Sequence, residues 1–150
     1  MTSPQIPVVR SCVAATFTAE PLQPFFAKAL GMFGFDVDLR FAPFNQVLQS
    51  LLDPSSLLST NEGGINLLLV RACDLGATDA ARARSAAREV AAAVGESTGH
   101  GVRRTMIALC PSAERLEIEQ VFAEDLRDQL KPLTGIDLID ASEALRLYGL

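Results

Sequence analysis

Residues Ile65–Arg71 read INLLLVR, an apolar run interrupted by Asn66 before it ends at an arginine. A run this short and this apolar is typical of a strand that is covered on both faces of a parallel sheet. We therefore predict a buried strand here, and the segments on either side of it extend the pattern.

Strand-like runs alternate with segments of helical period along the rest of the chain. The predicted strands are 8–16, 36–42, 65–71, 102–110 and 135–139. The predicted helices are 22–33, 45–52, 79–94, 112–130 and 141–148. Five such β/α units predict parallel strands with right-handed crossovers and a three-layer α/β sandwich. We expect a five-stranded parallel sheet of flavodoxin-like or SGNH-like order 2-1-3-4-5. Residues 1–6 are expected to form a disordered tail, and 7–150 a single domain.

Three segments have a more specific pattern. Apolar residues recur every three or four positions over 22–33, which predicts an amphipathic helix with a core face. Residues 36–42 alternate between apolar and charged, which is typical of a half-buried edge strand. The helix at 79–94 is rich in alanine, so it can lie close to a sheet.

Composition excludes several classes of protein. The chain has 150 residues, 49% of them apolar and 21% charged, with a mean hydropathy of +0.24, which indicates a packed core and not a disordered chain. A net charge of −5 argues against a nucleic-acid partner. No apolar run is long enough to cross a membrane, and the N-terminus does not resemble a secretion signal. Three cysteines without a framework spacing suit a reducing cytoplasm, where we expect the protein to be.

The expected site lies beyond the carboxyl ends of the strands, where the strand order reverses between strands one and three. Candidate ligand-binding residues at this edge are Thr16, Thr18, Asn45, Arg71, Asp74 and Ser112. All but Thr16 have a structural alternative. Thr18 and Asn45 could cap helices, Ser112 is a plausible N-cap of the helix over 112–130, and Arg71 could form an ordinary ion pair with Asp74.

Several familiar sites do not fit the sequence. The segment after the first strand, AATFTAEP, has no glycine, which excludes a phosphate-binding loop or a dinucleotide fingerprint there. The pair Asp36 and Asp38 begins a strand and does not follow one, so it does not match a phosphatase motif. Cys73 and Cys110 fall at the ends of neighbouring strands, but two thiols without a nearby histidine do not make a zinc site. We predict no metal, and Cys12 reads as a small core residue.

The first half of the chain carries motifs of a known family. AATFTAEPL at 14–22 resembles the "SNFTxEPL" opening of the N-terminal domain of FkbH-like proteins. APFNQV at 42–47 and LLDPSSLL at 51–58 are similar to "APYNQVxQ" and "LLDPxSLL" of that domain.

The second half continues the resemblance in the same order. Residues 61–71 resemble "NxDGVNVVLVR", ALCPS at 108–112 resembles "LCPPS", and 136–148 resembles the "GVHVLD…LY" ending. The resemblance covers residues 8–150.

FkbH-like proteins act in polyketide and related natural-product pathways. In these proteins a phosphatase-like domain acts on a glyceryl phosphate while the glyceryl group is loaded onto an acyl carrier protein. Their N-terminal domain is SGNH-hydrolase-like in fold, so the resemblance implies a domain of that fold in a polyketide or nonribosomal peptide pathway. The phosphatase domain and its aspartate motif are absent from this sequence.

A hydrolase of the SGNH type needs a serine after strand one and an Asp-x-x-His near the C-terminus. Here Thr16 or Thr18 takes the first position, and Glu143 takes the place of the histidine. His100, the single histidine, is predicted in the turn entering strand four, on the order of 20 Å from the site by strand length. The catalytic set is therefore incomplete, which leans against an enzyme.

The sequence leaves three functions open. The first is a non-catalytic domain that binds an acyl carrier protein, another synthase component, or the acyl or glyceryl thioester on the phosphopantetheine arm of a carrier protein. Apart from this phosphopantetheine arm, we expect no cofactor. The second is an acyltransferase or thioesterase with Thr16 or Cys110 as the catalytic nucleophile and a partner completing the site. The third is a scaffold or dimerisation module, and the sequence does not fix the oligomeric state. An acidic carrier would need a basic patch, for which Arg82, Arg84 and Arg88 are the candidates.

Overall fold

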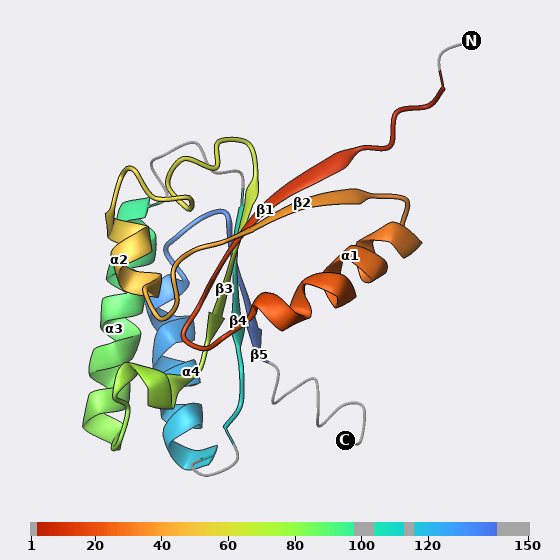
Figure 1. Ribbon diagram of the computed structural model, residues 1–150. Coiled ribbons are helices and arrows are strands. Elements are labelled where there is room, and N and C mark those ends of the chain that lie inside the picture. Colours follow the sequence, from red (N-terminus) through yellow and green to blue (C-terminus); the bar gives the residue numbers. More distant parts are fainter. Residues whose placement is uncertain (1–2, 98–103, 113–115, 141–150) are drawn as a thin grey trace.

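A single parallel sheet forms the centre of the computed structural model, which describes residues 3–97, 104–112 and 116–140 (Figure 1). Its strands are β1 (Val8–Ala15), β2 (Asp36–Phe41), β3 (Ile65–Val70), β4 (Arg104–Leu109) and β5 (Ile136–Asp140). They lie in the order β2-β1-β3-β4-β5, and each neighbouring pair is parallel. The predicted strand order is confirmed, with β2 at the edge of the sheet.

Helices cover both faces of the sheet, but unequally. The described residues form the helices α1 (Gln23–Met32), α2 (Val47–Leu52), α3 (Ala80–Ser97) and α4 (Leu116–Leu130). Of these helices, Figure 1 shows α2, α3 and α4 on one face and α1 on the other. Two short 3-10 turns, Glu20–Leu22 and Ala72–Leu75, follow β1 and β3. The helix predicted at 141–148 and the turn with His100 lie outside the described residues.

The main core lies between the sheet and the face covered by α2, α3 and α4. Leu68 of β3, Ile107 of β4, and Phe122 and Leu126 of α4 are almost completely buried in it. The inward face of α3 consists of small residues, among them Ala83 and Ala87, both fully buried. Because alanine side chains are short, this helix packs close to its neighbours, as its composition predicted. Cys12 is buried in the same core.

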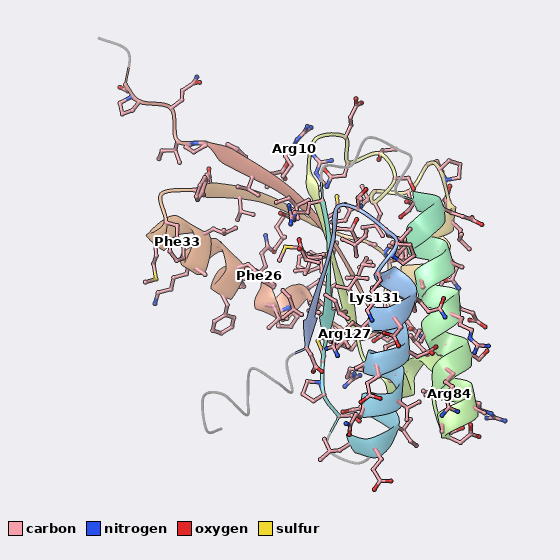
Figure 2. The ribbon with its side chains drawn as sticks, turned by 180° about the vertical axis from the view of Figure 1, so that it is seen from behind. Arg10, Phe26, Phe33, Arg84, Arg127 and Lys131 are labelled. Atoms are coloured by element: carbon pink, nitrogen blue, oxygen red, sulfur yellow. The ribbon has the colours of Figure 1, made fainter. Side chains whose placement is uncertain are left out.

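The predicted core face of the helix over 22–33 is wrong. No residue of α1 is buried, and Phe25, Met32 and Phe33 are 71%, 80% and 77% exposed. Phe26 and Leu30, four residues apart, are the only half-buried residues of this helix. The reason is its position, since α1 lies beside the edge strand β2, away from the middle of the sheet (Figures 1 and 2). Figure 2 places Phe33 at the end of α1 that is remote from the other helices.

Two asparagines form a buried polar network at the start of β3. Asn66, which is 2% exposed, donates through Nδ2 to the carbonyl oxygen of Leu58 at 2.8 Å. Its Oδ1 accepts a hydrogen bond from Asn61 Nδ2 at 3.0 Å, and the same nitrogen of Asn61 donates to the Ile65 carbonyl at 3.1 Å. The network fastens the loop before β3 to the strand, and it explains the one polar residue inside the apolar run.

We expect the Gly64→Ala variant to be destabilised by about 1–3 kcal/mol. A Cβ atom at Gly64 would lie 2.2 Å from Oδ1 of Asn61, which the hydrogen-bond network holds in place. Urea unfolding measures the change in the free energy of unfolding. The matched control is Gly31→Ala in α1, where a Cβ meets nothing within 4 Å and where alanine favours the helix. Equal stability of the two variants would contradict a fixed Asn61 side chain.

Candidate functional site

Three of the predicted site residues meet at the carboxyl ends of β1 and β3. Thr16 follows β1, Arg71 follows β3, and Asp74 lies in the 3-10 turn over Ala72–Leu75. The Thr16 hydroxyl donates to Asp74 Oδ2 at 2.9 Å and accepts a hydrogen bond from the Arg71 backbone N–H at 3.1 Å. Arg71 Nε donates to the same Asp74 oxygen at 2.7 Å. The ion pair therefore exists, and it also holds Thr16, which is only 3% exposed.

The guanidinium of Arg71 is fixed on two sides. It lies 4.8 Å from the centre of the Phe17 ring, in a cation–π contact. Its hydrogen bond with Asp74 raises the pKa of Arg71 above its usual value. Arg71 thus carries a permanent positive charge in the middle of this edge, and more than a third of its side chain is exposed.

The two cysteines at this edge differ in their surroundings. Burial raises the pKa of the Cys110 thiol, and the charge of Arg71 opposes this rise without cancelling it. Cys110 is therefore protonated at neutral pH, where a thiol is a poor nucleophile. Cys73 is exposed, and its thiol lies 3.8 Å from Asp74 Oδ1.

Thr18 and Asn45 do not cap helices. The cap positions of the turn over Glu20–Leu22, of α1 and of α2 are Ala19, Leu22 and Gln46, and none of them makes a side-chain capping bond. Asn45 instead adopts a positive φ of 51°, a conformation that asparagine tolerates better than most residues. Its backbone N–H donates to the carbonyl oxygen of Ala15 at 3.2 Å. Both side chains are exposed, and neither joins the Thr16 cluster.

A cleft of about 430 Å³ lies at the same edge of the sheet, between α4 and the ends of β3, β4 and β5. Its apolar walls include Val70, Leu109 and Phe122, and Cys110 lies at its edge. Three carboxylates and one guanidinium line it among the described residues, namely Glu119, Glu124, Asp140 and Arg127. The volume falls within the range of small-molecule sites.

Ser112 contributes to the cleft indirectly. Its backbone N–H and its hydroxyl both donate to Glu119 Oε1, at 2.5 and 2.6 Å. The other carboxylate oxygen of Glu119, Oε2, is buried and has no hydrogen-bond partner. The residues just before α4 lie outside the described part of the chain, so the predicted cap role of Ser112 stays a prediction.

The acidic residues and the arginine of the cleft were not among the predicted site residues. Glu119, Ala123 and Arg127 recur every four residues and so share one face of α4. Phe122 and Leu126, which are buried, lie beside them on the helix. Charged residues next to the buried stripe of a helix were the available signal for this site.

The remaining predicted features lie elsewhere. Arg82, Arg84 and Arg88 are exposed on α3, and Figure 2 shows Arg84 near one end of that helix. Among the described residues, no group of three or more His, Cys, Asp or Glu side chains could hold a metal ion. In that same part of the chain, no helix is long and apolar enough to cross a membrane.

Comparison with known proteins supports the fold. The chain is similar in structure to the N-terminal part of the protein BF1531 from Bacteroides fragilis, which contains a phosphatase domain and was crystallised with Mg. The TM-score is 0.74 at 11% sequence identity, over 96% of this chain and 43% of that one. The likeness is one of fold. This chain thus spans less than half of that structure, and neither a family model nor a curated protein matches it.

We expect the Thr16→Val variant to lose about 1–3 kcal/mol of stability. Valine has the shape of threonine but cannot accept from the Arg71 N–H or donate to Asp74, so two polar groups lose a partner. Thr16→Ser keeps both bonds and serves as the control. Urea unfolding of the two variants measures the difference, and a valine variant as stable as the serine variant would show that these bonds do not hold the edge together.

Proposed function

We propose that this domain binds an acyl group carried as a thioester on the phosphopantetheine arm of a carrier protein, and that it does so without cleaving the thioester. The observation that carries the proposal is an open cleft at the same carboxyl edge of the sheet as Thr16, whose hydroxyl already donates a hydrogen bond to Asp74. The resemblance to the N-terminal domain of FkbH-like proteins supports a role in a polyketide or nonribosomal peptide pathway.

The environment of Thr16 disfavours nucleophilic attack. Its hydroxyl proton is given to Asp74 Oδ2, an oxygen that also accepts from Arg71 Nε. A hydroxyl without an adjacent general base is a weak nucleophile, and the Asp74 oxygen that accepts from Thr16 is already engaged by Arg71. Thr16 is also almost completely buried, so an acyl carbon could not approach its oxygen without a rearrangement.

The other proposed nucleophile has a similar limitation. The Cys110 thiol lies at the edge of the cleft, but its raised pKa keeps it protonated at neutral pH. Cleavage would therefore need a partner that supplies a base. The binding function needs no such addition.

The position of three arginines supports docking of an acidic carrier. Arg82, Arg84 and Arg88 are exposed on α3, the helix that follows the turn containing Asp74. The chain as a whole has a net charge of −5, so an acidic carrier would be repelled elsewhere on the surface. Complementary charge at this helix would direct the carrier to the edge that holds the cleft.

A titration with an acyl carrier protein in its apo, holo and butanoyl-loaded forms tests the proposal, with thioester loss followed in parallel. We expect the loaded form to bind more tightly than the apo form, and the thioester to persist. Loss of the thioester would favour the acyltransferase or thioesterase. Equal binding of all three forms would favour a scaffold.

The basic patch is tested by replacing Arg82, Arg84 and Arg88 together with glutamate, which should weaken carrier binding strongly at low salt. A control with the same change in charge replaces three cations away from the patch, Arg10, Lys28 and Arg40, which lie on β1, α1 and β2. Figure 2 shows Arg10 far from Arg84. Equal weakening by both triple variants would mean that overall charge, and not this patch, directs the carrier.

A further inference from the structure

We propose that the cleft beside α4 selects a ligand with a positively charged amine at its end, and that Glu119 Oε2 accepts a hydrogen bond from that amine. Under the proposed function, the acyl group would then be an aminoacyl group, so this part of the inference rests on the proposed function. The amine site itself rests on Glu119 and its surroundings.

The two oxygens of Glu119 have different environments. Oε1 accepts two hydrogen bonds from Ser112, which fix the carboxylate against the segment that follows β4. Oε2 is buried and has none. A buried carboxylate oxygen without a donor is costly, and such groups are rare in folded proteins. A donor supplied by a ligand would complete the hydrogen bonding of this oxygen.

The charge of the cleft favours a cation as that donor. Glu124 lines the same cleft as Glu119, and Arg127 is the cation among the described lining residues. Figure 2 shows Arg127 on the side of α4 towards the end of β5. Among the described lining residues, the two glutamates thus outnumber the guanidinium. In a partly desolvated cleft this excess attracts an ammonium group and repels a phosphate or a carboxylate.

The apolar walls define the rest of the ligand. Among the apolar residues that line the cleft, Pro111 and Leu116 are exposed. A short aliphatic chain can lie against these two side chains while its terminal amine reaches Glu119. The ligand class is therefore an aliphatic amine joined to an acyl group, as in an ω-aminoacyl thioester.

Two probes that differ in one group test the inference. β-Alanyl-pantetheine and butanoyl-pantetheine have the same chain length, with an ammonium in the first where the second has a methyl group. By isothermal titration calorimetry we expect the β-alanyl compound to bind about 10–100-fold more tightly, as for a hydrogen bond to a charged group. Hydroxypropanoyl-pantetheine, which donates a hydrogen bond without a charge, should bind with intermediate affinity. Equal affinity for all three compounds, or tighter binding of the hydroxyl compound, would overturn the inference.

Variants assign the selectivity to one residue. Glu119→Gln keeps the size of the side chain but removes its charge, so it should abolish the preference for the amine. Glu117→Gln is the matched control, because Glu117 lies in the same first turn of α4 but is exposed and does not line the cleft. A preference that survives Glu119→Gln would overturn the assignment. The comparison of probes on the unmodified protein holds even if a variant does not fold.

The same experiment separates this inference from the proposed function. The small compounds β-alaninamide and butanamide lack the pantetheine arm. If they show the amine preference while no loaded carrier protein binds, the amine site stands and the proposed function fails. If loaded carriers bind without any preference for an amine, the proposed function stands and the amine site is refuted.

Discussion

Replacing Phe122 by alanine is expected to lower the free energy of unfolding by about 3–5 kcal/mol. Phe122 is 1% exposed and belongs to the main core, where α4 packs on the sheet together with the neighbouring helix α3. The substitution removes an aromatic ring from a closely packed interior, and the surroundings collapse only partly into the cavity. Since natural domains are stable by about 5–15 kcal/mol, the variant should unfold at a much lower urea concentration.

The control for this prediction is another phenylalanine in a helix. Phe25 of α1 is 71% exposed, so Phe25→Ala should change stability by less than about 0.5 kcal/mol. Urea unfolding followed by circular dichroism gives both values, and unchanged m-values would show that the two variants unfold from comparable states. A similar loss in both variants would contradict the unequal covering of the two sheet faces.

Asn66→Ala is expected to cost about 3 kcal/mol, because it leaves buried polar groups without partners. The Leu58 carbonyl loses its donor, and Asn61 Nδ2 loses one of its two acceptors. The shortened side chain also leaves a cavity under the loop before β3. Thermal or urea unfolding of the purified variant measures this loss.

A double-mutant cycle shows whether the two asparagines act as one unit. The double variant Asn61→Ala/Asn66→Ala removes both side-chain amides, so neither is left buried without its hydrogen bond to the other. The double variant should therefore lose less stability than the sum of the losses in the two single variants. Simple additivity would mean that the 3.0 Å contact between the two side chains contributes nothing of its own.

The sheet was predictable because each strand has a local signature. The apolar run at Ile65–Val70 indicated burial on both faces, and the alternation at Asp36–Phe41 indicated an edge. The rule that parallel sheets bind ligands where strand order reverses then placed Thr16, Arg71 and Asp74 together, and the structure joins them by hydrogen bonds. Local pattern and topology were sufficient for these features.

The features that were not predicted depend on what lies opposite a side chain. The sequence period of α1 indicated which residues share a face, but not that Phe25 would be 71% exposed. In the same way, Glu119 and Arg127 look like ordinary surface charges of α4 until the ends of β3, β4 and β5 are placed beside them. A sequence pattern identifies a helical face, whereas the partner of that face is a property of the whole fold.

The interior position of β1 in the sheet has a consequence for how the chain acquires this fold. Val8 pairs with Asp36 in β2, and Ser11 pairs with Ile65 in β3, so the first strand has no hydrogen-bonding neighbour close to it in sequence. During synthesis β1 must wait for β3 to leave the ribosome before both of its sides are occupied. Sheets built from such distant pairings nucleate slowly, because loop closure comes before any gain from the contacts. We therefore expect refolding to be slower than in helical domains of this size, with the β1–β3 pairing as its late step.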